Sequence, residues 1–368
     1  MTKRTTLVLL GTLAVSLLIT DRCPAAPNIG DLTGLPTTGP LGPTGEKAID
    51  RYVAECIDEL VKAKIPRKVK EAISNLKVGY QANPSVVFHI EYARASAKHA
   101  PSALSLEDDP LRRLKEINLS IEAARMDQYT ILPILEAMAA HENPGVRYWA
   151  AKGFRNTGKR FLDQGGRYTR AMVSTLERLG LTDPAGPVVT EAIITLGHHS
   201  GEKGSGGKTI SAALAKVWLA RCQEVLAGKA GMAGMIRRSF RVIPRVAQLH
   251  LAPAQRSAGA RKLALQMLVD AMEAGSLAFE AGTEDEDNPR TKALRRLLIG
   301  VETASAAQLG VNQTPVSGVL AGKEPLAKQR VKARLEVNGF WTPKFQAEGV
   351  TTRVKAPATK PAATSPAG

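Results

Sequence analysis

Apolar residues return every three or four positions along most of this chain, which is the spacing of one buried face of an α-helix. From Ile49 to Leu60, large apolar side chains share one side of the expected helix and charged side chains share the other. No stretch alternates apolar and polar residues for long enough to indicate a β-sheet. The pattern predicts an all-α fold, with helices over 47–63, 66–80, 84–98, 110–125, 127–141, 144–157, 167–180, 184–198, 208–227, 232–250, 254–280, 289–308 and 325–338.

Proline marks the start of several of these helices. An acidic or amide residue followed by proline supplies an N-cap and a first-turn proline, and such dipeptides occur at Asp109-Pro110, Asp183-Pro184 and Asn288-Pro289. Asn143 begins another, 40 residues before Asp183 (183 − 143). That interval lies within the length of known helical repeats. The chain is therefore expected to repeat a helix pair.

The stretch from Asn143 to Gly158 resembles the second helix of a HEAT repeat. That helix opens with Asp/Asn-Pro-x-Val-Arg and continues with two small residues and a large apolar one; the matching residues are Asn143, Pro144, Val146, Arg147, Ala150, Ala151 and Phe154. The buried face is expected to contain Val146, Trp149, Ala150, Gly153 and Phe154. The resemblance implies a HEAT-like (armadillo-type) α-solenoid of antiparallel helix pairs, a fold that serves as a binding scaffold more often than as an enzyme.

A second, weaker resemblance concerns residues 191–219. They are similar to a turn of the squalene-cyclase-type helical toroids, in which Gly- and His-rich loops join paired helices. The Gln-Trp repeats of the cyclases are absent, so this resemblance implies a shape and not cyclase chemistry. An α/α toroid and an irregular helical bundle stay open as alternative folds.

Composition divides the chain into four segments. Residues 1–25 are predicted to be a signal peptide, because two basic residues precede an apolar run and a small residue stands at Ala25. The apolar run is shorter than the roughly 20 residues of a spanning helix; an uncleaved anchor is the alternative. Residues 26–46 are rich in Pro, Gly and Thr and predict a flexible linker. The helical-repeat domain is expected over 47–342, and a disordered basic tail over 343–368.

The overall composition fits close-packed helices in an exported protein. Of the 368 residues 44% are apolar but only 4% are aromatic, whereas a β-sandwich would use more aromatic and β-branched residues. The formal charge is +16, and removal of the leader would leave +14. Cys56 and Cys222 both fall on apolar helix faces, so we expect two independent buried thiols and no disulfide.

Positive charge is concentrated in one part of the chain. Residues 225–269 contain eight Lys or Arg and no Asp or Glu. If 232–250 forms one helix, four arginines fall within one arc about 100° wide, opposite an apolar side: Arg237, Arg238, Arg241 and Arg245. Arginine forks suit carboxylate or phosphate groups, so the pattern predicts a docking face for an acidic partner.

Two considerations bear on that prediction. The arginines could instead form an ordinary solvated face, neutralised by Glu280 and the acidic run 284–287. Nucleic acid is a poor candidate for the partner, because this stretch offers only Phe240 for base stacking, and on the apolar side.

A second polar candidate is the loop 198–207, which contains His198, His199 and Glu202. Neighbouring helical residues point about 100° apart, so adjacent histidines chelate poorly. Residues 201–209 lack a phosphate-loop glycine, because Glu202 occupies its position. No catalytic motif, metal-ligand spacing or cofactor motif emerges, so we expect no cofactor.

Taken together, the sequence favours an exported, non-catalytic helical-repeat scaffold that binds a protein or an acidic polymer of the cell envelope. A toroid enzyme or carbohydrate-binding module that uses the 198–207 loop is the first alternative. A purely structural envelope protein is the second. The two alternatives make different demands on the structure. An enzyme needs acids or histidines that converge in one pocket, and a structural protein needs no exposed arginine cluster.

Overall fold

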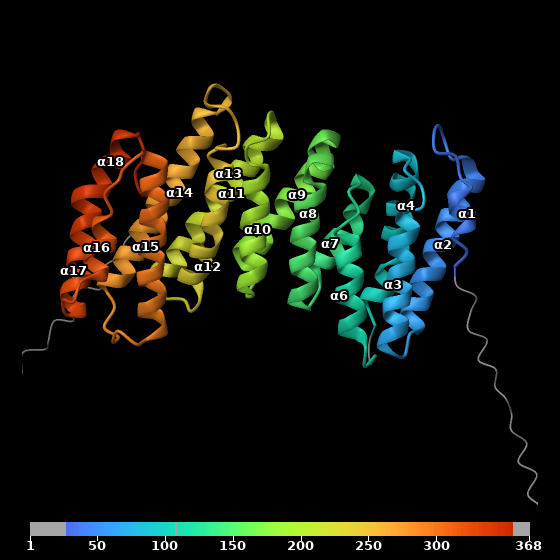
Figure 1. Cartoon of the computed structure of the whole chain (residues 1–368), viewed down its shortest axis with the longest axis horizontal. Helices are drawn as coiled ribbons and strands as arrows, with labels where there is room; N and C mark the ends of the chain where they lie inside the picture. Colours follow the sequence, from blue (N-terminus) through green and yellow to red (C-terminus); the bar gives the residue numbers. More distant parts are fainter. Residues whose placement is uncertain (1–26, 107–108, 356–368) are drawn as a thin grey trace, which may run out of the picture.

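The computed structural model describes residues 27–106 and 109–355, and this part of the chain contains helices and turns but no strand. Figure 1 shows the helices standing side by side in a row, from α1 at one end of the molecule to α17 and α18 at the other. The row is open and its two ends lie far apart, so the closed ring of a toroid is not formed. The prediction of an all-α, HEAT-like solenoid is confirmed.

The helices form two layers, in which each helix packs against its neighbours in the same layer and a partner in the other. The first layer consists of α2 (Gly42–Lys62), α4 (Val86–His99), α7 (Leu132–Ala140), α9 (Gly166–Thr182), α11 (Ser205–Leu226), α14 (Ala258–Glu280) and α17 (Leu326–Glu336). The second consists of α3 (Pro66–Tyr80), α6 (Arg112–Ala123), α8 (Pro144–Gln164), α10 (Gly186–His199), α12 (Met232–Ser239), α15 (Pro289–Leu309) and α16 (Pro315–Ala321).

Short helical elements fill the ends and the connections between the layers. They are α1 (Gly30–Thr33), α5 (Pro101–Leu104), the 3-10 turns η1 (Tyr129–Ile131), η2 (Phe240–Val242) and η3 (Pro253–Gln255), α13 (Ile243–Val246), the π-helical turn η4 (Val337–Trp341) and α18 (Thr342–Ala347).

Asn143-Pro144 and Asn288-Pro289 start helices as expected, whereas the helices after Asp109-Pro110 and Asp183-Pro184 begin two residues after the proline, at Arg112 and Gly186. The Asn143 side chain accepts a hydrogen bond from the backbone N–H of Gly145, and Asn288 does the same for Arg290. These contacts satisfy N–H groups that have no partner inside the helix. Helices α8 and α15 therefore begin at the prolines that the sequence marked.

The buried face of α8 shows why small residues recur on it. Val146, Ala150 and Phe154 are fully buried. A Cβ atom at Gly153 would lie only 2.5 Å from Leu135 Cδ2 of α7, so the glycine allows the two helices to approach closely.

The placement of Trp149 in this core was wrong. Its ring is only partly buried, at the edge of the apolar face. The Lys152 ammonium lies 4.3 Å from the centre of the ring, and Tyr148 meets the ring edge-on. The buried face of α8 is narrower than the periodicity suggests because Ala150 and Gly153, and not the indole, fill the contact with neighbouring helices.

The expectation of a flexible linker over residues 26–46 was also wrong for the part that the structure describes. Residues 30–33 form α1, and α2 already begins at Gly42. Leu32 and Leu41 are buried in the core, and the Asn83 side chain donates a hydrogen bond to the backbone carbonyl of Leu35. Two leucines thus suffice to dock this Pro- and Gly-rich segment on the first helix pair. The predicted signal peptide lies outside the described residues.

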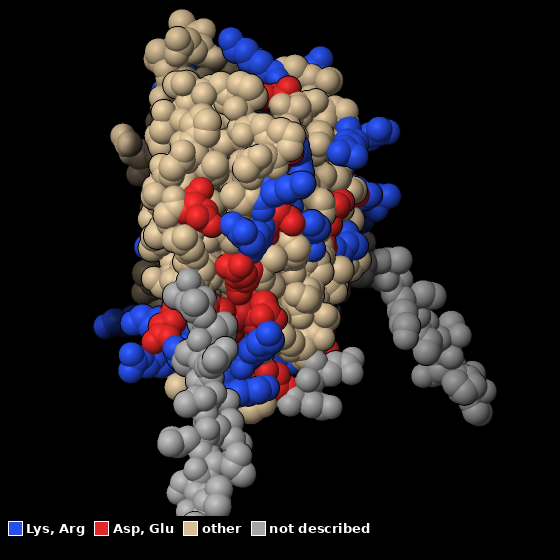
Figure 2. Space-filling view, turned by 90° about the vertical axis from the view of Figure 1, so that its right-hand side faces the viewer, with Lys and Arg blue, Asp and Glu red and all other residues tan. Residues whose placement is uncertain are grey.

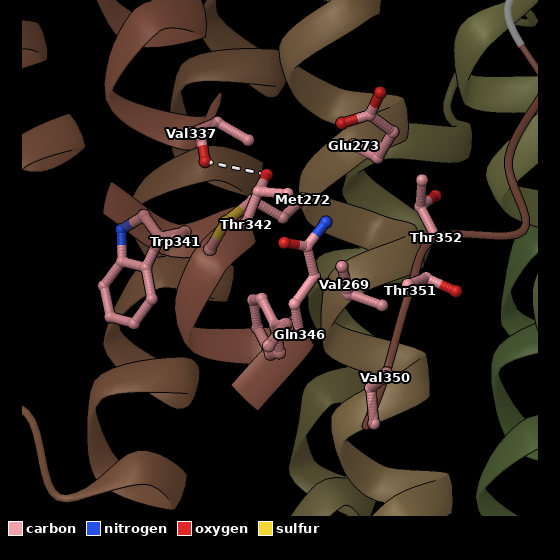
Figure 3. Close-up of a pocket in the computed structure, with 11 residues that line it drawn as sticks. Val269, Met272, Glu273, Val337, Trp341, Thr342, Gln346, Val350, Thr351 and Thr352 are labelled. Atoms are coloured by element: carbon pink, nitrogen blue, oxygen red, sulfur yellow. Dashed lines mark hydrogen bonds between the residues drawn. The ribbon is translucent and has the colours of Figure 1, made fainter. Parts of the chain in front are cut away.

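The expected tail from residue 343 is ordered at its start. Residues 342–347 form α18. Residues 348–355, here called the C-terminal strap, begin with a turn at 348–349 and then run without helical structure beside α14 (Figure 3). Val350 and Val354 of the strap are buried. The strap encloses a small cavity of about 70 Å³ with Val269 and Met272 of α14. The sequence did not indicate that the strap packs on the protein, because only two apolar residues mark it. Residues 356–368 lie outside the described part.

Both cysteines of the described chain behave as predicted. Cys56 of α2 and Cys222 of α11 are free and buried, and burial raises the pKa of each thiol. Among residues 27–106 and 109–355, no helix has the length and apolarity that a membrane crossing requires.

Candidate functional site

The predicted basic helix 232–250 is three separate elements in the structure. Helix α12 ends at Ser239, the 3-10 turn η2 follows, and α13 starts with Pro244 in its first turn. Proline lacks the backbone N–H that would continue the helical hydrogen-bond pattern. The four arginines therefore do not line one straight helix, and their positions depend on the turn between α12 and α13.

Two of these arginines lie over α10 and meet charged or polar groups of that helix. Arg241 Nη2 lies 3.8 Å from Glu191 Oε2. Arg245 donates a 3.4 Å hydrogen bond from Nε to the backbone carbonyl of His198. From the opposite side, Arg155 of α8 reaches Glu191 Oε1 with Nη1 at 2.7 Å. We call Arg155, Arg241 and Arg245, together with the Glu191 carboxylate that Arg155 and Arg241 share, the arginine cluster.

Glu191 is the centre of the arginine cluster and is almost inaccessible. It is 1% exposed, although it stands on the side of α10 that faces away from the first layer, because Arg155 and Arg241 lie over it. The Arg155 side chain is 25% exposed and that of Arg241 is 63% exposed. Burial raises the pKa of the Tyr148 phenol on α8, and the charge of the nearby Glu191 carboxylate raises it further.

The other two arginines of the predicted face lie apart from the cluster. Arg237 extends toward α15, where its Cγ lies 3.4 Å from the position that a Cβ on Gly300 would take. Arg238 reaches the start of α10, where its Nη2 lies 3.8 Å from the position that a Cβ on Gly186 would take. The single helix 232–250 was therefore wrong, but Arg238, Arg241 and Arg245 all approach α10 while Arg237 approaches α15, and a docking face of these arginines stays a prediction.

The proposed neutralisation by the acidic run was wrong as well. Glu280 and Glu284 pair with Arg334 and Arg290, and Asp287 pairs with Lys292. All of these basic partners belong to α15 or α17. Among the four predicted arginines, Arg241 meets an acid, Glu191 of α10, and it shares that carboxylate with Arg155.

The end of the molecule that carries α1 and α2 provides a contrast. Figure 2 looks onto this end, and acidic and basic side chains alternate across it. Arg51 pairs with Asp31 at 2.7 Å, and Lys98 pairs with Asp50 at 2.9 Å. Acidic side chains thus lie among the basic ones at this end, and Asp50 also pairs with His99.

In the polar loop 198–207, the two histidines have different partners. His199 is buried and its Nε2 contacts the backbone carbonyl of Arg155, close to Gly158 of α8. Burial is the main cause that lowers its pKa to about 4. His198 is partly buried, and burial followed by the charges of Arg245 and Arg155 lowers its pKa too. The two rings point to different surroundings, and the described residues hold no group of three His, Cys, Asp or Glu side chains placed for a metal ion.

Sequence reasoning missed Arg155 and Glu191, which complete the arginine cluster. Glu191 did carry a signal, since it is the only acidic residue between Asp183 and Glu202 in an otherwise apolar helix. A lone carboxylate on such a helix is costly to bury without a partner. That partner comes from α8, 36 residues earlier, and nothing in the local pattern of α8 identifies Arg155.

Comparison with known proteins identifies no family for this chain. No family model matches the chain, and no curated protein matches it. Among solved structures it resembles Kap121p, as seen in the crystal structure of Kap121p bound to Ste12p, with a TM-score of 0.40 and 13% sequence identity. The match covers 82% of this chain and 35% of the Kap121p chain, so the protein spans about a third of the length of that relative.

Proposed function

We propose that this protein is a non-catalytic α-solenoid scaffold that binds an acidic protein partner through the arginine cluster. The observation that carries the proposal is a local excess of positive charge: Arg155 and Arg241 share the Glu191 carboxylate, Arg245 meets only a backbone carbonyl, and Arg241 extends into solvent. Guanidinium forks form short, charge-assisted hydrogen bonds with carboxylates. An approaching Asp- or Glu-rich segment therefore meets donors that the protein itself leaves partly unused.

Several features favour a protein partner over nucleic acid. Binding to single strands needs open aromatic faces on which bases can stack. Beside the arginine cluster, the Trp149 ring is covered by the Lys152 ammonium, and Phe240 packs against the buried Trp218. Apart from Tyr148, which lies near Glu191, these aromatic rings are engaged within the protein.

Export to the cell envelope is part of the proposal and rests on the sequence of residues 1–25. The basic start, apolar run and small residue at Ala25 are the features of a cleavable leader. Mass spectrometry of the natural N-terminus tests this. We expect a chain that starts at Ala26; a chain that keeps Met1 or Thr2 would refute cleavage.

Binding is tested with a fluorescein-labelled oligoglutamate peptide, measured by fluorescence anisotropy. The wild-type protein should bind it, and affinity should fall as salt rises, because exposed charges are screened over about 8 Å at physiological ionic strength. Arg241→Glu with Arg245→Glu should lower the affinity about ten-fold or more, since charge reversal opposes the approach of an acidic segment.

The matched control is Lys64→Glu with Lys70→Glu, which changes the net charge equally at two exposed positions near the junction of α2 and α3. It should leave the affinity nearly unchanged. Equal losses in both double variants would show that only overall charge matters and would refute a specific surface. If alginate binds through the same arginines and the peptide does not, the partner is an anionic polymer; if neither binds, a purely structural role is favoured.

A further inference from the structure

Within the arginine cluster, Glu191 is bound unequally by its two arginines. Arg155 Nη1 lies 2.7 Å from one carboxylate oxygen, a close ion pair whose geometry does not satisfy that buried oxygen as a hydrogen-bond acceptor. Arg241 Nη2 lies 3.8 Å from the other oxygen, which is beyond hydrogen-bond distance. Arg241 is therefore attracted by Glu191 without donating a hydrogen bond to it.

The loosely held arginine is also the accessible one. The Arg241 side chain is 63% exposed, whereas Glu191 is 1% exposed. An incoming carboxylate can reach Arg241 from solvent, but it cannot displace Glu191 from beneath. Arg245 lies one helical turn further along, and its Nε bond to the His198 carbonyl is long at 3.4 Å. Two donors four positions apart are thus available to a segment with two neighbouring acidic side chains.

We propose that Glu191 is a built-in competitor for the docking carboxylate, which orients Arg155 and Arg241 in the free protein and sets the affinity for a segment with two acidic side chains. The inference rests on the proposed function of the arginine cluster. Glu191 repels an approaching carboxylate and attracts Arg241 toward the protein, and both effects weaken docking. A surface of this kind binds acidic segments reversibly and rejects segments with a single acid.

The decisive variant is Glu191→Gln, which removes the charge and keeps the size and an acceptor oxygen. It should bind the oligoglutamate peptide about ten-fold more tightly than the wild type, with a steeper loss of affinity as salt rises. Glu324→Gln is the matched control, because it removes one carboxylate near α17 from an exposed pair with Lys332. The control should bind like the wild type.

A second pair of variants guards against a folding defect in Glu191→Gln. In Arg155→Gln, Glu191 loses its tight partner and should draw in Arg241, so that the peptide binds more weakly. Adding Glu191→Gln to Arg155→Gln should restore binding to at least the wild-type level. Circular dichroism of each variant verifies that the helices are intact.

The outcomes separate this inference from the proposed function. If the folded wild type does not bind the peptide, the function of the arginine cluster is refuted. If the wild type binds and Glu191→Gln binds equally or more weakly while remaining folded, docking at the arginines stands but Glu191 does not compete. A peptide with isolated glutamates should bind more weakly than oligoglutamate; equal binding would contradict the requirement for two acids.

Discussion

The C-terminal strap should stabilise the end of the solenoid mainly through one buried ion pair. Asp270 of α14 is fully buried. It accepts hydrogen bonds from Arg353 of the strap through the backbone N–H at 2.8 Å, Nε at 2.9 Å and Nη2 at 2.5 Å. Gln266 donates a further bond at 3.0 Å. The change Arg353→Met keeps an unbranched side chain but removes the guanidinium donors, Nε and Nη2, that bind this carboxylate.

The size of the effect follows from what remains buried. Removal of one partner from a buried ion pair typically costs roughly 3–5 kcal/mol, because the other charge is left uncompensated. The Arg353 side chain is 33% exposed, so water can enter the space that its head group leaves. The backbone N–H of residue 353 and Gln266 would also still bind the carboxylate. We therefore expect the lower end of the range, about 3 kcal/mol.

Urea unfolding followed by circular dichroism measures this change in the free energy of unfolding. Arg261→Met is the matched control, since Arg261 binds the same strap through an exposed pair with Glu348, with side chains 51% and 33% exposed. Exposed pairs contribute about 0–1 kcal/mol. Equal losses for the two variants would refute the reasoning that burial of Asp270 decides the effect.

A double variant tests the cause directly. If the loss in Arg353→Met comes from an uncompensated charge, Asp270→Asn added to it should recover most of the stability. If the loss comes only from a detached strap, the double variant should be no more stable than Arg353→Met. Limited proteolysis should show cleavage of the strap first in Arg353→Met, because solenoids can open from one end.

Three further predictions concern the core. Phe154→Ala should lower the free energy of unfolding by about 3–5 kcal/mol, and Trp149→Ala by less, because its ring is partly solvated; equal losses in chemical unfolding would contradict this. Burial lowers the pKa of His199 to about 4 from its ordinary 6.5. Between pH 4 and pH 6.5 the unfolded chain therefore binds more protons at this residue than the folded protein does. Stability should fall by roughly 3 kcal/mol as pH drops from 6.5 to 4 and then level off, and His199→Gln should lack this component; an unchanged pH profile in the variant would refute it. In the denatured, unreduced mature protein, thiol titration should find Cys56 and Cys222 free, and a peptide that links them would be incompatible with the extended row of helices.

The sequence predicted the helices well because helix formation depends on residues close in the chain. The three- and four-residue spacing of apolar side chains and the prolines after Asn143 and Asn288 located α8 and α15. The HEAT-like resemblance then indicated how helix pairs stack. The same local reasoning failed for the strap and for α1, where a few apolar residues dock a polar segment. Whether such a segment packs depends on the surface that it meets.

The arginine cluster shows the limit most clearly. The sequence by itself determined that residues 225–269 are basic and that Glu191 stands alone on an apolar helix. Only the tertiary structure decided that α8 brings Arg155 to Glu191 and that η2 and α13 turn Arg241 and Arg245 toward α10 while Arg237 extends toward α15. Periodicity fixes which side of each helix is buried, but it does not fix how far neighbouring helices shift and rotate against one another. That shift and rotation decide which charges meet.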